Sequence, residues 1–235
     1  MLRGVNLDVR AGEIVGLAGV SGNGQRELAE CLSGLRKVTG GLIALGGRDI
    51  IHASLRERIG AGLAYVPEER MRDGAIREFS VEENLFLRDI DNPQFTNGIF
   101  LNFPEMAAHA RQLVSKFNVK TPRLDTPIKN LSGGNIQKLI MARELSRQPR
   151  VLIAAQPTRG VDIGASEYIR QRLLEQRASG VAILLISEDL DELLALSDRV
   201  VVMYRGRMSA PMARRDVTIR RLGLMMAGQV FADAA

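Results

Sequence analysis

The stretch GVSGNGQR, from Gly19 to Arg26, decides the fold of this chain. It follows an apolar run, Glu13 to Ala18, and leads into a helical pattern from Arg26 to Leu35. A glycine-rich turn between a buried strand and a helix lets backbone N–H groups and the helix N-terminus converge on an anion. The stretch therefore indicates either a phosphate-binding loop or a plain tight turn.

The spacing of the glycines favours a P-loop over a dinucleotide-binding loop. Gly19 and Gly24 have the separation of the P-loop pattern, whereas a dinucleotide fingerprint would need a glycine where Glu27 stands. After its last glycine the P-loop pattern has Lys and then Ser or Thr, but this chain has Gln25 and Arg26. The backbone of the loop is kept and its charged and metal-binding side chains are replaced.

Composition narrows the class of protein. Hydrophobic residues make up 46% of the 235 residues and charged residues 25%, which is ordinary for a soluble globular protein. The longest apolar runs, such as Val181–Ile186, have the length of a strand and are too short to span a bilayer. The net charge of +5 suits anionic ligands or an anionic membrane face, but aromatic residues are only 4%, so nucleic acid is not expected as a partner. The single cysteine, Cys31, excludes an internal disulfide and is expected in the core.

The order of the apolar patterns predicts an α/β fold with a largely parallel sheet. An inserted, mostly helical subdomain is expected at about residues 81–147, between core segments 1–80 and 148–235 of one domain. Helical patterns extend over Arg26–Leu35, Pro104–Phe117, Gly134–Arg147, Ala165–Arg177 and Asp189–Leu196. Strands are expected at Ile14–Ala18, Leu42–Leu45, Leu63–Val66, Val151–Ala154, Val181–Ile186 and Val200–Met203.

A second glycine motif, Leu131-Ser132-Gly133-Gly134-Asn135, precedes a helical pattern. Ser132 can cap that helix, and its hydroxyl, the two glycine amides and the helix dipole can all face an anion. The motif resembles the signature of ATP-binding-cassette (ABC) domains, with Asn135 where Gln is commonest. Further segments follow the ABC order: a Q-loop-like Tyr65–Glu68, a D-loop-like Thr158–Asp162 and a switch-like Ile186–Leu190.

The resemblance implies the P-loop ABC ATPase fold. Within the family, the chain most resembles the second of two fused ATPase domains in bacterial importers for simple sugars or nucleosides. This resemblance is closest over Pro157–Ala165. ATP is the nucleotide that it implies. The residues that the resemblance assigns to nucleotide binding are Gly19, Ser21, Gly22, Asn23, Gly24, Gln25, Arg26, Glu68, Ser132, Gly133, Gly134, Asn135 and Asp162.

Five positions at which an active member of the family carries catalytic or metal-binding groups are altered. They hold Gln25, Arg26, Ala155, Gln156 and Glu188. Gln156 can orient water but cannot accept its proton, and loss of a general base commonly costs ~10²–10⁴ in rate. Mg²⁺ is poorly supported, although Glu68 could approach a metal or water. We therefore expect no intact catalytic residue and a weak or inactive site.

The intact signature implies a partner. In the family, two domains face each other head to tail, and the signature of one closes over the P-loop of the other. The resemblance thus implies a second nucleotide-binding domain whose site Ser132, Gly133 and Gly134 complete, and membrane-embedded permease subunits that hold the chain at the cytoplasmic face of the inner membrane. No aromatic residue precedes Tyr65 to stack on adenine. Either this chain binds adenine weakly, or it is the C-terminal portion of a longer fused polypeptide. Because Met1 lies so close to the first core segment, we expect the second arrangement, with the partner domain upstream.

Two other functions stay open at this point. The chain could be a slow but genuine ATPase, supported by Arg26, Glu68 and Gln156. It could also be a nucleotide-gated regulatory module that is not involved in transport.

Overall fold

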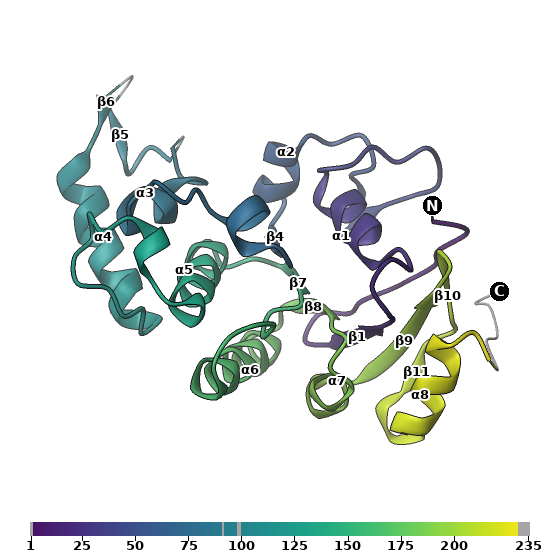
Figure 1. Cartoon of the computed structure of the whole chain (residues 1–235). Coiled ribbons are helices and arrows are strands. Elements are labelled where there is room, and N and C mark those ends of the chain that lie inside the picture. Colours follow the sequence, from purple (N-terminus) through teal and green to yellow (C-terminus); the bar gives the residue numbers. More distant parts are fainter. Residues whose placement is uncertain (1, 91, 98–99, 230–235) are drawn as a thin grey trace. The chain divides into compact units, whose positions relative to one another are not determined.

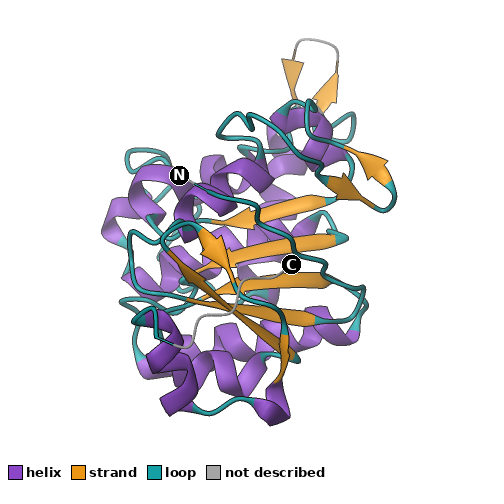
Figure 2. Ribbon diagram, turned by 90° about the vertical axis from the view of Figure 1, so that its right-hand side faces the viewer, coloured by secondary structure: helices purple, strands orange, loops and turns teal. Residues whose placement is uncertain are grey.

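The computed structural model describes residues 2–90, 92–97 and 100–229, and these residues form the α/β fold expected (Figure 1). Seven of the described strands form one sheet in the order β10-β9-β1-β8-β7-β4, with β11 also paired to β9. Figure 2 shows these strands side by side. The sheet contains β1 (Ile14–Ala18), β4 (Leu63–Val66), β7 (Val151–Ala155), β8 (Ala182–Ile186), β9 (Arg199–Tyr204), β10 (Arg207–Met208) and β11 (Met212–Ala213).

The centre of the sheet is parallel, as predicted. Strand β1 pairs with β8 and β9, and β8 pairs with β7, all in parallel register. Only β10 and β11 are known to run antiparallel to their neighbour β9 among the described pairings. The carboxyl ends of β1, β7 and β8 therefore lie along one edge of the sheet, where ligands of open α/β sheets bind.

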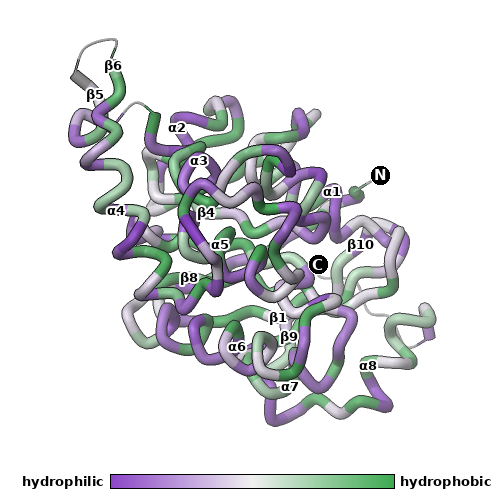
Figure 3. The backbone as a smooth tube through the Cα atoms, turned by 60° about the vertical axis from the view of Figure 1, so that its left-hand side comes forward, coloured by the Kyte–Doolittle hydropathy of each residue, from purple (hydrophilic) through white to green (hydrophobic). Residues whose placement is uncertain are grey.

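Both faces of strand β1 are covered, which explains its continuous apolar sequence. Figure 3 shows the hydropathy of each residue along the backbone. Val15 and Leu17 lie in one core cluster with Leu28 of helix α1 (Gln25–Ser33). On the opposite face, a Cβ added to Gly16 would lie 2.9 Å from Leu193 of helix α7 (Leu190–Leu196). Glycine at position 16 thus permits the close approach of that helix. Cys31 is 9% exposed, as expected for a core residue.

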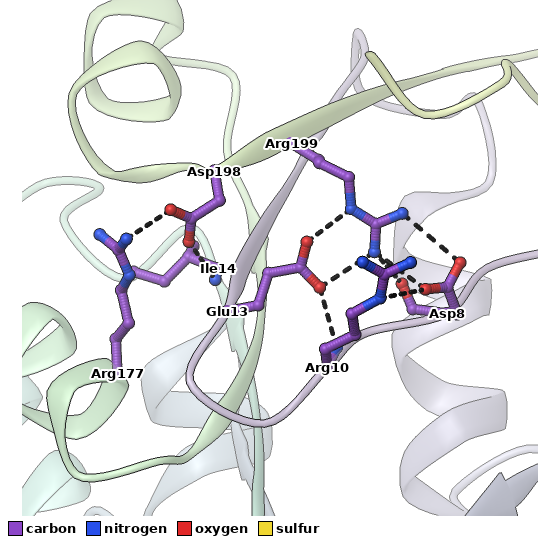
Figure 4. Close-up of polar contacts among 7 residues, drawn as sticks. All are labelled: Asp8, Arg10, Glu13, Ile14, Arg177, Asp198 and Arg199. Carbon is purple, nitrogen blue, oxygen red and sulfur yellow. Dashed lines mark hydrogen bonds and ion pairs between the residues drawn. The ribbon is translucent and has the colours of Figure 1, made fainter. Parts of the chain in front are cut away.

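An ionic cluster fastens the segment before β1 to the start of β9 (Figure 4). Arg199 donates to Glu13 Oε2 at 2.9 Å and to Asp8 Oδ2 at 3.0 Å. Asp198 accepts a hydrogen bond from the backbone N–H of Ile14 at 2.9 Å. The two neighbouring residues Asp198 and Arg199 therefore hold the amino end of the strand that leads into the P-loop.

The chain separates into two compact units. The first takes in the described chain up to Tyr65, the segment Pro149–Gln156 and the described chain from Arg170 onward. The second comprises Val66–Gln148 and Pro157–Ile169, and so includes residues 66–80 and 157–169, which the sequence interpretation had assigned to the core. The division at 81 and 147 stays a prediction.

The second unit is mainly helical, and one buried ionic network holds it together. Glu144 of helix α5, whose side chain is 0% exposed, pairs with Arg88 at 2.5 Å and with Arg143 at 3.0 Å. Arg143 also donates to the Gly74 carbonyl at 2.7 Å. Its elements are α3 (Val81–Phe86), β5 (Thr96–Asn97), β6 (Phe100–Leu101), α4 (Phe103–Lys116), α5 (Gly133–Ser146) and the start of α6 (Ile163–Ala178).

One predicted strand is wrong. Residues Leu42–Leu45 do not join the main sheet: only Ala44–Leu45 are extended, as β2, and they pair with β3 (Arg48–Asp49) in a separate two-stranded sheet. Leu42 is 71% exposed, so the apolar run is not a buried strand. Helices α2 (Leu55–Gly60) and α8 (Ile219–Met226) were not predicted, nor were the two-residue strands β3, β5, β6, β10 and β11. None of the helices within the described ranges is both long and apolar enough to cross a membrane.

Candidate functional site

The glycine-rich loop connects the carboxyl end of β1 to the amino end of α1, in the layout of a P-loop. Gly22 has φ +87° and Gly24 has φ +117°, both in the region that favours glycine. A Cβ at Gly24 would also lie 3.0 Å from Met203 Sδ. The loop backbone therefore depends on glycine at these positions.

Gln25 lies inside the loop. Its Nε2 donates to the Val20 carbonyl at 3.0 Å, and a Cβ added to Gly19 would lie only 2.4 Å from this nitrogen. The residue is 8% exposed. An uncharged amide thus occupies the interior of the loop at the position of the usual lysine. Arg26 forms an ion pair with Glu30 of the same helix, at 2.7 Å.

Asn23 ties the loop to the turn between β9 and β10. Its side chain donates to the Val20 carbonyl at 2.9 Å and accepts from the Arg205 N–H at 2.9 Å. Its own carbonyl accepts from the Gly206 N–H at 2.8 Å. These contacts give Asn23 a structural role in the shape of the loop, in addition to the nucleotide contact that the resemblance assigns to it.

Three further predicted positions lie at or just beyond the carboxyl ends of the neighbouring strands β7 and β8. Ala155 ends β7, is 5% exposed and has no polar side-chain atom. Gln156 follows with φ +48°, and its N–H donates to the Ile186 carbonyl at 2.7 Å. Its side-chain Oε1 accepts from the backbone N–H of Glu188 at 3.2 Å. The Glu188 carboxylate in turn accepts a hydrogen bond from the Ser21 hydroxyl of the P-loop.

The structure thus brings Ser21, Gln156 and Glu188 together at one edge of the sheet. The direct Ser21–Glu188 bond was not anticipated. The two residues are 167 positions apart, and no sequence pattern links them. They meet because β1 and β8 are neighbouring strands of the sheet. No proton-accepting group takes the place of the usual base, because Gln156 is an amide.

In the second unit, Ser132 is the N-cap of α5, as predicted. Its hydroxyl oxygen accepts from the Asn135 backbone N–H at 3.4 Å and from the Asn135 side chain at 2.9 Å. Asn135 Oδ1 accepts from the Lys120 N–H at 2.8 Å. The residue in the place of the commoner Gln therefore holds the serine hydroxyl and joins the signature to the start of the loop that follows α4.

The two signature glycines are required by close contacts. A Cβ at Gly133 would lie 3.2 Å from the Gly160 carbonyl oxygen. A Cβ at Gly134 would lie 2.8 Å from Ala165 Cβ and 3.0 Å from Asp162 Oδ2. Asp162 Oδ1 accepts from the Ala165 N–H at 2.8 Å at the start of α6. The signature and the segment that resembles a D-loop thus form one tightly packed structure.

Sequence reasoning missed Arg70, which joins these two segments. Its guanidinium donates to the carbonyl oxygens of Gly133 at 3.2 Å, Arg159 at 2.7 Å and Gly160 at 3.3 Å. Burial lowers the pKa of this guanidinium below its ordinary value. No sequence pattern indicates that Arg70 joins these segments, because all three acceptors are backbone oxygens that are distant from Arg70 in the sequence.

The residues present do not fit a bound metal ion. Glu68, the candidate in the Q-loop-like segment, is paired with Arg159. Ala155 offers no oxygen, and within the described residues no group of three or more His, Cys, Asp or Glu side chains could hold a metal.

Comparison with known proteins identifies relatives of the same kind as the motifs of this site suggest. The family model described as "ABC transporter" matches residues 2–159. The chain is similar to the glucose import ATP-binding protein TsgD13 of Haloferax volcanii, with 48% identity over 97% of this chain and 42% of that protein. It is also similar to the guanosine import ATP-binding protein NupO of Bacillus subtilis, with 42% identity over 99% of this chain and 46% of that protein. The chain thus spans less than half the length of these two relatives.

A solved structure gives the same fold. The ATP-binding cassette MJ0796, in a dimeric post-hydrolysis state bound to ADP and Pi, matches with a TM-score of 0.77 over 91% of this chain and 90% of that chain. At 21% identity this likeness concerns the fold alone. Because the family model covers more than half of the chain and the fold agrees, the chain belongs to the ABC transporter family as an ATP-binding domain.

Proposed function

We propose that this chain is the ATP-binding part of an importer for simple sugars or nucleosides, and that it acts mainly through its signature. Its own nucleotide site is degenerate, whereas Ser132, Gly133 and Gly134 complete the ATP site of a partner domain. The observation that carries the proposal is this contrast: the signature keeps its cap and its close contacts, while Gln25, Ala155 and Gln156 lack the groups that hydrolysis needs.

The transported class follows from the relatives. One of them is named for glucose import and the other for guanosine import, at similar identity. We therefore keep both sugars and nucleosides as the proposed cargo. The degenerate P-loop does not distinguish them, because it contacts nucleotide and not cargo in the proposed arrangement.

The proposed partners are a second nucleotide-binding domain with intact catalytic residues and transmembrane permease subunits. The partner domain is the one that we expect fused upstream in the same polypeptide. Residues 81–147 are proposed to form the subdomain that docks on the permease, with the chain peripheral at the cytoplasmic face of the membrane. Closure of the two domains on ATP would then drive transport.

At its own site, this chain can contribute binding but little chemistry. The loop and the N-terminus of α1 can hold phosphate through backbone N–H groups. Gln25 can donate a hydrogen bond but adds no positive charge, so it stabilises developing negative charge less than a lysine does. Gln156 can position water without removing its proton. ATP is therefore proposed as a bound ligand that this site turns over weakly or not at all.

The proposal is tested by the ATPase activity of the assembled importer. Ser132→Arg replaces the helix cap with a bulky cation and should reduce turnover by about 100-fold or more, as expected when a transition-state contact is lost. The matched control is Ser179→Arg, at an exposed serine just after the end of α6 and outside residues 81–147, which should leave turnover unchanged. Unimpaired turnover in the Ser132 variant contradicts the proposal. Turnover by the chain alone that falls in a Gln25→Ala/Gln156→Ala double variant would favour the slow-ATPase alternative.

A further inference from the structure

The P-loop of this chain already has a carboxylate bound to it. Glu188 accepts the hydrogen bond of the Ser21 hydroxyl, and the two residues come from segments that follow the adjacent parallel strands β8 and β1. The position of Glu188 is fixed from its other side, since its backbone N–H donates to Gln156 Oε1 at 3.2 Å. Gln156 is itself bonded to the end of β8 through the Ile186 carbonyl at 2.7 Å. The carboxylate is therefore held at the loop by a chain of contacts.

Within the described residues, the Glu188 carboxylate forms no ion pair that would compensate its negative charge. Gln25, which occupies the loop interior, is neutral and donates to the Val20 carbonyl. Arg26, the nearest arginine along the chain, forms an ion pair with Glu30, whose carboxylate also pairs with Arg36 at 2.6 Å. Burial alone would raise the pKa of Glu30, but the hydrogen bonds from these two arginines lower it, so the ion pairs are retained at neutral pH.

From this arrangement we propose that Glu188 is a specificity-determining residue, which makes the P-loop discriminate against nucleotides in proportion to the negative charge of their phosphates. A phosphate that reaches the Ser21 hydroxyl must displace the Glu188 carboxylate, and a phosphate nearby is repelled by it. An ordinary P-loop gains affinity with each added phosphate. Here the gain from backbone N–H groups is opposed by a fixed like charge, so ADP binds at least as tightly as ATP. The inference rests on the proposed function only in that the loop binds nucleotide.

The test is a nucleotide titration of the full chain without Mg²⁺, using fluorescently labelled ATP, ADP and AMP. Wild-type protein should bind ATP no more tightly than ADP. Glu188→Gln removes the charge but keeps an oxygen that can accept from Ser21, and should tighten ATP binding about tenfold, with a smaller gain for ADP and none for AMP. A tenfold gain would make ATP the preferred ligand of the variant.

Asp191→Asn is the matched control. It removes one negative charge three residues away, on the exposed side of the first turn of α7, and should change the three affinities equally and by less than about twofold. Equal changes for ATP, ADP and AMP in Glu188→Gln, or no change, overturn the inference while nucleotide binding stands. If neither the wild-type protein nor any variant binds a nucleotide, both the inference about Glu188 and the proposed nucleotide binding at this P-loop are wrong. The role of the signature is then still tested by Ser132→Arg.

Discussion

At the scale of single residues, Arg58 shows that one buried guanidinium can hydrogen-bond to the backbone of several segments. It is 2% exposed, and among the described contacts it pairs with backbone oxygens: those of Cys31 at 3.1 Å, Leu32 at 2.8 Å, Ile51 at 3.0 Å and Ala53 at 3.1 Å. Two of these carbonyls belong to the last turn of α1, which follows the P-loop. Arg58 therefore closes the C-terminal end of the helix that the loop begins.

We predict that Arg58→Ala lowers the free energy of unfolding by about 3 kcal/mol or more, because buried carbonyls lose a charged donor and a cavity is left. Urea denaturation measures the effect. The control is Arg56→Ala on the exposed side of the same helix α2, which should cost less than about 0.5 kcal/mol. Equal losses in the two variants would show that the carbonyl contacts add nothing.

Arg199 gives a prediction about pH (Figure 4). Burial alone would raise the pKa of Glu13, but the hydrogen bonds from Arg199 and from the Arg10 N–H lower it below its ordinary 4.5. The pKa of Asp8 is also lowered, chiefly by its hydrogen bond with Arg199. A carboxyl group whose pKa is lower in the folded state stabilises the fold above its unfolded pKa, and this stabilisation is lost as the pH falls through the folded pKa.

Arg199→Met should therefore lower the free energy of unfolding by about 2 kcal/mol at pH 7, and the difference from wild type should shrink steadily below pH 4.5. Unfolding curves at several pH values between 3 and 7 check this. Arg215→Met, at a side chain that is 89% exposed, should give a curve parallel to that of wild type. A difference that stays constant with pH would mean that the cluster acts through packing and not through charge.

At the scale of elements, two glycines in helices should respond in opposite directions to the same change. Gly134→Ala in α5 places a Cβ 2.8 Å from Ala165 of α6, so we expect a loss of about 1–3 kcal/mol from overpacking. Gly223→Ala in α8 meets nothing within 4 Å and should stabilise by about 0.5–1 kcal/mol, because alanine is the better helix former. Urea denaturation followed by circular dichroism compares them, and a gain in both would show that α5 and α6 have room between them.

The elements that could be predicted from the sequence are those defined by the hydropathy pattern of their own residues. β1 and β4 have the predicted bounds, because each is a short apolar run between polar or turn residues. The helix after the P-loop begins at Gln25, one residue before the prediction. The strand predicted at Leu42–Leu45 was wrong, because an apolar run does not specify the strand with which it pairs. Arg70 and the Ser21–Glu188 bond were out of reach, because their partners are distant in sequence and, for Arg70, are backbone atoms.

At the scale of the whole molecule, the proposed function depends on holding the signature in a fixed position relative to the segment that resembles a D-loop. Arg70 does this with one planar group that reaches Gly133 on one side and Arg159 and Gly160 on the other. Lysine keeps the charge but is a flexible point charge that cannot reproduce this fork. Arg70 is thus a positioning residue for a surface that, in the proposed function, acts on the partner's ATP and not on this chain's own.

We predict that Arg70→Lys lowers kcat of the assembled importer ATPase about tenfold or more and leaves KM for ATP within about twofold, because a misplaced signature weakens contacts made in the transition state. Nucleotide affinity of the chain's own P-loop should not change, which separates a positioning role from general unfolding. The control is Arg72→Lys, since Arg72 pairs with its sequence neighbour Asp73 at 2.7 Å. Equal loss of kcat in both variants, or a rise in KM with kcat preserved, would assign Arg70 to the stability of residues 66–74 and would leave the signature to be positioned by its glycines alone.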